Sequence, residues 1–291
     1  MIWLAVLLAL ASALTVGLST SLQHRAAHEA PAEIGSVGLI AHLLQRPWWW
    51  VGQALGFLAL IFHATALAFG PLALVQPIAI MGMVFAPPIR AAMSRRWLPR
   101  DEAVAVVATF AGLIAFLIAT APEESVVEPG AGITTIVAAL VVLSAVLVGV
   151  AGRVADSGLR GTLLGCAAGL LFGSVAVCLK IVTSGLSSDG LGAVLATATP
   201  YAVVAMGLAG IGINQLAYRS ARLSASMPAL NIVNVLVALV IGYLVFEEAP
   251  RHTPAALLVE VAAAVVIGWG LVRLARLEEA AESEAEDVSV G

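Results

Sequence analysis

Six polar side chains interrupt long apolar segments of the sequence and could do chemistry there. They are His63, Gln76, Asn214, Asn231, Asn234 and Glu260. Amide and carboxylate oxygens bind cations and polar organic molecules, and an imidazole exchanges a proton near neutral pH. Such groups are costly inside a lipid bilayer and are functional candidates by default, so the set predicts a substrate-binding route. The alternative for each residue is a structural hydrogen bond between neighbouring helices.

His63 and Glu260 are the two ionisable members of this set. Gly52 and Gly56 share a helical face with His63, which predicts that His63 points toward a neighbouring helix, where it could relay protons. Glu260 shares its face with Ala263 and is the only carboxylate well inside an apolar segment. We expect it to hold a cation, as the candidate metal ligand, or a coupling proton. A neutral acid that bonds a neighbouring helix remains the alternative.

The four amides fit a cation or a polar metabolite as cargo. Asn231 and Asn234 are one helical turn apart, and Asn214 lies in the preceding apolar segment. Gln76 precedes Pro77, which removes one backbone hydrogen bond and can open the helix at that point.

Composition indicates which environment positions these side chains. Of the residues, 61% are hydrophobic and 11% are charged, and the mean hydropathy is +1.03. Soluble domains carry about 25% charged residues. The chain therefore has too little polar surface for a water-soluble globule, and its surplus apolar surface must face lipid.

Nine segments approach the length of about 20 apolar residues that a membrane-spanning helix needs. They are Ile2–Leu22, Trp48–Phe69, Leu72–Ala92, Ala103–Ala121, Ile133–Ala151, Gly161–Val182, Pro200–Tyr218, Ser224–Phe246 and Pro254–Leu274. The shorter run Ile34–Gln45 could instead lie at the membrane interface. The predicted fold is an all-α polytopic membrane protein.

The basic residues predict how these helices are oriented. With nine spans, every Lys and Arg except Lys180 and Arg251 falls on the same side of the membrane. Short cytoplasmic loops are rich in Lys and Arg. We expect a plasma (inner) membrane protein with its N-terminus outside and its C-terminus in the cytoplasm.

Weak internal similarity divides the chain into two halves. Leu98-Pro99-Arg100 and Ala249-Pro250-Arg251 are offset by 151 residues, as are Pro77 and Pro228. The predicted units are a four-helix repeat (1–122), a linker with the fifth helix (123–158), a second four-helix repeat (159–275) and an acidic disordered tail (276–291). An odd number of spans per period turns the second repeat upside down, which is common in transporters. Gly165, Gly169 and Gly173 form a ridge of small residues that favours close helix packing.

Several motifs resemble the drug/metabolite transporter (DMT, EamA-like) superfamily, and most closely its NIPA-type magnesium transporter branch. They are the runs Pro47–Gly52 and Ala66–Pro77, and the order Asn214-Gln215-Leu216, Pro228 and Phe246-Glu247-Glu248. The similarity extends from the first to the ninth helix. It implies a nine-helix transporter fold, alternating access and transport of Mg²⁺.

The sequence thus predicts a transporter whose partners are the lipid bilayer and a small-molecule or ion substrate. Export of small polar metabolites or drugs is the alternative to Mg²⁺, and a non-transporting scaffold or a membrane-embedded enzyme ranks lower. HExxH, GxSxG, Walker A and helix-opening GxGxxG motifs are absent from the sequence, so we expect no enzyme and no cofactor. No basic, aromatic-interleaved patch indicates nucleic acid. A homodimer is a further candidate assembly.

Overall fold

The computed structural model describes residues 2–28, 42–120, 132–220, 223–248 and 253–290, and within them it contains helices and no strands. The helices are α1 (Ile2–His28), α3 (Pro47–Phe69), α4 (Leu72–Ala79), α5 (Met81–Met93), α6 (Arg100–Thr120), α7 (Gly132–Ala151), α8 (Ser157–Ser188), α9 (Gly190–Leu195), α10 (Thr199–Ser220), α11 (Leu223–Val245) and α12 (Pro254–Val290). The predicted all-α class is confirmed for this part of the chain.

Nine spans among the described residues are long and apolar enough to cross a membrane, as predicted. Helices α4 and α5 together form one of them, Leu72–Met93. Most span ends lie within three residues of the predicted ends. The largest differences are in α8, which has 32 residues, and in α12, which has 37. The Asp156 carboxylate caps α8 by accepting a hydrogen bond from the Leu159 N–H at 2.6 Å, so the helix begins before the apolar segment does.

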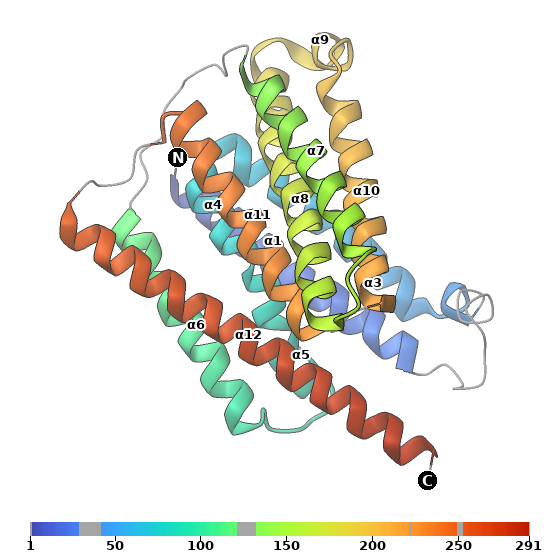
Figure 1. Cartoon of the computed structure of the whole chain (residues 1–291). Helices are drawn as coiled ribbons and strands as arrows, with labels where there is room; N and C mark the ends of the chain where they lie inside the picture. The colour runs from blue at the N-terminus through green and yellow to red at the C-terminus, as the bar shows by residue number, and fades with distance from the viewer. Residues whose placement is uncertain (1, 29–41, 121–131, 221–222, 249–252, 291) are drawn as a thin grey trace.

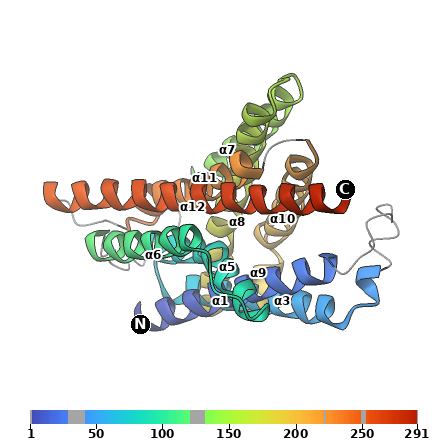
Figure 2. The ribbon, with the colours of Figure 1, turned by 90° about the horizontal axis from the view of Figure 1, so that it is seen from below.

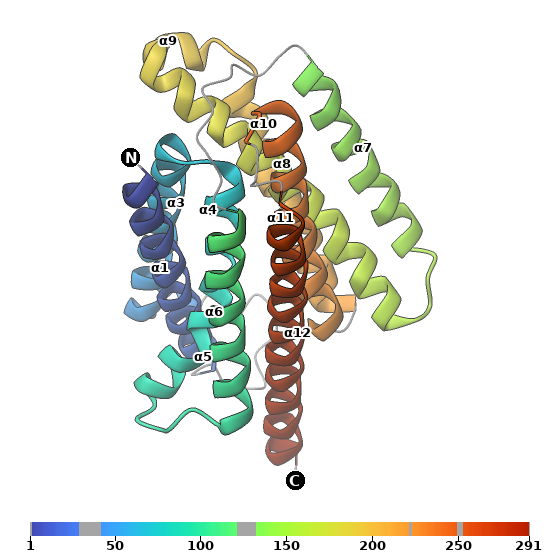
Figure 3. The same cartoon turned by 90° about the vertical axis from the view of Figure 1, so that its left-hand side faces the viewer.

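The helices of the two predicted halves pack in a similar pattern (Figures 1 and 3). Helix α1 packs against α3 and against α4 and α5, and α8 packs against α10 and α11. Helix α6 runs beside α12 (Figure 2). Helix α4 contacts α11 between the halves. Helix α7 packs on α8 at the margin of the bundle (Figure 3). The repeat and its boundaries stay predictions, but the contacts of corresponding helices are those that such a repeat would produce.

Glycines bring α8 and α11 into close contact. A Cβ at Gly169 would lie 2.6 Å from the Leu230 carbonyl oxygen, and one at Gly173 would lie 2.6 Å from the Val237 Cβ. Both distances are too short for any larger residue, so the predicted ridge of small residues is confirmed as a helix–helix interface. The two helices therefore form a tightly packed pair.

The acidic end of the chain differs from its predicted disorder. Helix α12 continues to Val290. Alanine and glutamate, which dominate this stretch, are strong helix formers, and that preference outweighs the repulsion between like charges. Glu278 in this extension pairs with Arg90 of α5 at 3.1 Å. The acidic segment after α6 and most of the run Ile34–Gln45 lie outside the described residues.

Candidate functional site

The most deeply buried charges in the described residues are Lys180 of α8 and Glu248, which follows the end of α11. Glu248 is 1% exposed and Lys180 is 9% exposed, and the two side chains form an ion pair. Isolated charges are strongly disfavoured in such an environment, so each requires the other. Glu248 also requires further donors, because a carboxylate accepts several hydrogen bonds.

Those donors come from the start of α4. The Leu72 N–H donates to Glu248 Oε1 at 2.9 Å, and the Ala73 N–H donates to Oε2 at 3.1 Å. The first N–H groups of a helix have no partner within it, and the helix dipole favours negative charge there. Residue Pro71 precedes α4 and provides no side-chain cap of its own. A carboxylate from 176 residues away therefore caps this helix.

Lys180 has two further contacts. Its ammonium donates to the Gly70 carbonyl at 3.4 Å and lies 5.0 Å from the centre of the Phe246 ring. Gly242 leaves space for the carboxylate, since a Cβ there would lie 2.6 Å from Glu248 Oε2. We call Lys180, Glu248, the Gly70 carbonyl and the first N–H groups of α4 the Lys180 cluster. It joins the α3–α4 turn of the first predicted half to α8 and the end of α11 in the second.

Sequence reasoning did not select this cluster. It treated Lys180 as an exception to the positive-inside pattern, and it noted Glu248 within a family motif without pairing it with Lys180. A usable signal was present, because Lys180 is the only lysine of the chain and lies inside an apolar segment. A buried lysine requires a carboxylate partner, although its identity could not be inferred from local sequence.

His63 and Gln76 were predicted separately, and the structure brings them together. The Gln76 amide nitrogen and His63 Nε2 are 3.3 Å apart, and the ring tautomer sets which atom donates. Gln76 is 2% exposed. It lies within α4, and the helix breaks at Ile80 rather than at Pro77. The pair links α3 to α4 within the first predicted half.

The three candidate asparagines differ in whether their side chains have hydrogen-bond partners. The Asn231 amide donates to the Met227 carbonyl at 2.9 Å and approaches Met83 Sδ of α5 at 3.7 Å, so its amide nitrogen has partners. Asn214 is partly buried on α10 and also has a partner. Asn234 Oδ1, by contrast, is buried and has no hydrogen-bond partner in the part of the chain that the structure describes. Unsatisfied buried acceptors are rare and often indicate a water or ligand.

Glu260 resembles Asn234 in this respect, because its Oε1 is buried and has no hydrogen-bond partner among the described residues. Gly112 lies against Ala263, and Gly270 lies against Thr109, so α6 and α12 run antiparallel and Glu260 lies toward the Thr120 end of α6. Thr120 Oγ1 is also buried and unsatisfied. No group of three His, Cys, Asp or Glu side chains gathers among the described residues, so Glu260 has no such companions there as a metal ligand.

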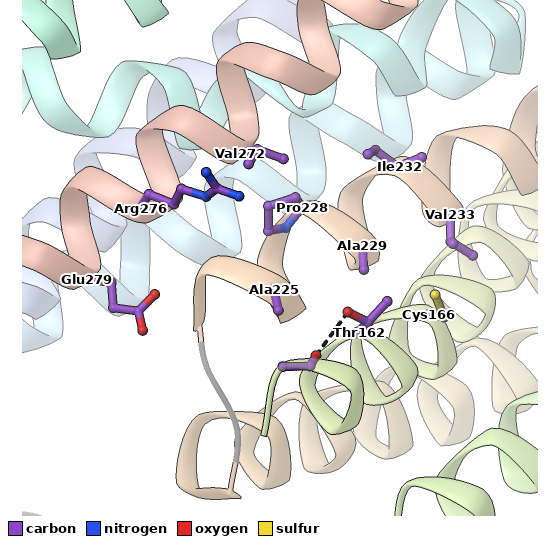
Figure 4. Close-up of a pocket in the computed structure, with 11 residues that line it drawn as sticks. Thr162, Cys166, Ala225, Pro228, Ala229, Ile232, Val233, Val272, Arg276 and Glu279 are labelled. Carbon is purple, nitrogen blue, oxygen red and sulfur yellow. Dashed lines mark hydrogen bonds between the residues drawn. The ribbon is translucent and has the colours of Figure 1, made fainter. Parts of the chain in front are cut away.

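A cavity of about 740 Å³ lies between α8, α11 and α12, and we call it the α12 cavity (Figure 4). Thr162 and Cys166 line it from α8, and Pro228 lines it from α11, among mostly apolar neighbours. Arg276 and Glu279 of α12 supply its charges. Lys180 follows Cys166 by 14 residues, which is about 21 Å of helix. The cavity and the Lys180 cluster therefore lie at opposite ends of α8.

Comparison with known proteins identifies one relative. An uncharacterized protein of Corynebacterium glutamicum is 32% identical over 252 residues, which cover 84% of this chain and 85% of that protein. The two chains belong to one family. No family model matches the chain, and no solved structure matches it.

For this family member, the nine apolar helices establish a multi-pass integral membrane protein. Its described residues combine a fully bonded buried ion pair at one end with a cavity at the other. Three further side-chain oxygens, those of Thr120, Asn234 and Glu260, are buried and have no hydrogen-bond partner among the described residues. A cavity of this size can hold a small solute.

Proposed function

We propose that the protein is a secondary transporter or facilitator of the DMT type, working by alternating access between two inverted halves. The observation that carries this proposal is the position of the Lys180 cluster. It ties the two halves together at one end of α8, while the α12 cavity opens at the other end. Closure at one end with a cavity at the other is what an alternating-access transporter presents in each of its end states.

The basic residues give this arrangement an orientation. With the N-terminus outside and the C-terminus in the cytoplasm of a plasma-membrane protein, the α12 cavity lies at the cytoplasmic end and the Lys180 cluster at the outer end. The structure then corresponds to an inward-facing state. The proposal assigns the chain no enzymatic activity.

The α12 cavity favours a small organic cargo. Its volume lies in the range of about 300–1,000 Å³ that is typical of small-molecule sites. Apolar side chains line most of it, and Arg276 and Glu279 supply opposite charges. These features suit an organic molecule with an apolar body and an ionic group, so export of metabolites or drugs is our leading assignment.

Magnesium is the second candidate, and a different observation favours it. The unsatisfied buried atoms Thr120 Oγ1, Asn234 Oδ1 and Glu260 Oε1 are all oxygens, the ligand type that Mg²⁺ prefers. Mg²⁺ keeps several waters and needs only one or two carboxylates. Glu260 would supply one.

A flux assay in proteoliposomes separates the two cargoes. Purified protein is reconstituted, and Mg²⁺ entry is followed with an enclosed dye, with and without a pH gradient. In parallel, charged amphiphilic compounds are screened for thermal stabilisation, and those that bind are tested for counterflow. Glu260→Gln should abolish Mg²⁺ entry if magnesium is the cargo, whereas Arg276→Gln should reduce counterflow of an organic anion.

Glu278→Gln is the matched control for Glu260→Gln, since it makes the same change on the same helix outside the apolar segment. Saturable flux in either arm supports transport and identifies the cargo class. Folded protein that moves neither magnesium nor any bound compound would overturn the proposed function.

A further inference from the structure

We infer that Lys180 and Glu248 are gate residues, and that opening their contact narrows the α12 cavity at the far end of α8. The first part rests on the geometry of the cluster. The second part, the coupling of the two ends, rests on the proposed function.

The Lys180 cluster is built to separate without unfolding a helix. Glu248 lies three residues beyond the end of α11, and the neighbouring Glu247 has a φ of 53°, in the left-handed region. Rotation about a few backbone bonds there can remove the carboxylate while α11 stays intact. The exposed N–H groups of Leu72 and Ala73 can then bind water, as the unpaired groups at any helix start do.

The polar part of the contact between the two halves at this point centres on one carboxylate. Glu248 bonds Lys180 and the N–H groups of Leu72 and Ala73, beside an apolar cluster that includes Ile241 and Phe246. A purely structural interface could rely on this apolar packing alone, without the desolvation of two charges. A charged contact that water can replace on separation is better suited to a joint that opens.

Helices α8 and α11 connect the cluster to the cavity. Helix α8 carries Lys180 near one end and Cys166 near the other, and α11 lines the cavity at Pro228 and ends near Glu248. The close contacts at Gly169 and Gly173 hold the two helices together as one body. If this body tilts away from α4 at the cluster, its other end moves toward α12 and narrows the cavity.

Three positions allow the α12 cavity and the Lys180 cluster to be probed with thiol reagents: two native cysteines and one alanine that can be replaced by cysteine. Cys166 is partly exposed in the α12 cavity. Cys178 is buried against Leu171 and Met206, on a different side of α8 from the cluster, and serves as an internal control. Ala73 is 4% exposed beside Glu248, so a thiol placed there tests access to the cluster.

The test measures thiol labelling by a charged, membrane-impermeant maleimide on protein in lipid nanodiscs, where the reagent reaches both faces. Three single-thiol proteins are prepared: Cys178→Ala, Cys166→Ala, and Ala73→Cys with both native cysteines replaced by alanine. Each is studied with the native ion pair, with Glu248→Gln, and with Lys180→Met combined with Glu248→Gln. The double variant leaves no unpaired buried charge, so it keeps the test valid if Glu248→Gln alone does not fold.

With the native pair, we expect Cys166 to react and the other two thiols to be protected. Weakening the pair should raise the labelling rate at position 73 by about tenfold or more and lower that of Cys166 by a similar factor, since a shift between two states changes both populations. The rate at Cys178 should not change. Glu278→Gln, which breaks the more exposed pair with Arg90, is the matched control and should alter none of the three rates.

Protection of position 73 in both pair variants would overturn the gate. Labelling of Cys178 together with position 73 would also overturn the gate, because it would show that loss of the ion pair loosens the whole fold. An unchanged Cys166 rate would overturn the coupling. The readout needs no cargo, so a protein that shows the reciprocal labelling but no flux refutes the proposed function alone, whereas flux without the labelling change refutes the gate alone.

Discussion

The Lys180 cluster and the region around Glu260 differ in how they surround a carboxylate, which is buried in Glu248 and half-buried in Glu260. Glu248 has a lysine and two backbone N–H groups as partners, whereas Glu260 Oε1 has none among the described residues. Burial of a polar group is costly unless its hydrogen bonds are made. A fully bonded carboxylate stabilises the contact it makes, and an unsatisfied one leaves room for a ligand, an ion or water. The first region is thus suited to holding helices together, and the second to binding a polar partner.

The largest expected effect comes from removing the bonded carboxylate. Glu248→Ala leaves Lys180 without its counterion and α4 without its cap, so stability should fall by about 3–5 kcal/mol. Thermal unfolding in detergent measures the change. Combining it with Lys180→Met should recover part of the loss. If Glu248→Ala were as stable as the native protein, the Lys180 cluster would make no net contribution to stability.

A smaller loss should follow from separating the two helices that carry the cluster. Gly173→Leu forces a side chain against Val237, and overpacking of this kind costs about 1–3 kcal/mol. Gly212→Ala on α10 is the matched control, because a Cβ at Gly212 meets nothing within 4 Å. Equal melting temperatures for the two variants would contradict the close α8–α11 interface.

Glu260→Gln tests whether Glu260, unlike Glu248, serves binding rather than stability. We expect this variant to lose flux without losing stability. An amide is cheaper to bury than an unpartnered carboxylate, so stability should stay the same or rise by up to about 1 kcal/mol. Flux should be lost if Glu260 binds the cargo or a coupling proton. A stability loss comparable to that of Glu248→Ala would show that Glu260 has a structural partner instead.

The smallest effect is expected at the ion pair between Arg90 and Glu278, whose side chains are 27% and 33% exposed. Pairs near solvent contribute about 0–1 kcal/mol, and salt weakens them. Glu278→Gln should therefore change the unfolding temperature little, and less still at high ionic strength. A large loss of stability in Glu278→Gln would mean that the pair of Arg90 and Glu278 is as important to the fold as the buried pair of Lys180 and Glu248.

Sequence patterns predicted individual elements well and their partners poorly. The nine spans followed from apolar runs, and the packing of Gly169 and Gly173 followed from their spacing. His63 and Gln76 were each selected as polar residues inside spans, but their hydrogen bond depends on how α3 and α4 turn about Gly70. The tail was predicted as disordered from its charge, whereas the helix preference of its alanines and glutamates continues α12 to Val290.

The sequence by itself determined that this chain is a helical membrane protein, because each span is a property of about 20 consecutive residues and their transfer into lipid. Only the tertiary structure decided which polar groups meet. Lys180 and Glu248 are 68 residues apart, and Glu248 reaches α4 across 176. Contacts at such separations depend on how whole helices pack side by side, and apolar runs that face lipid carry little information about that choice.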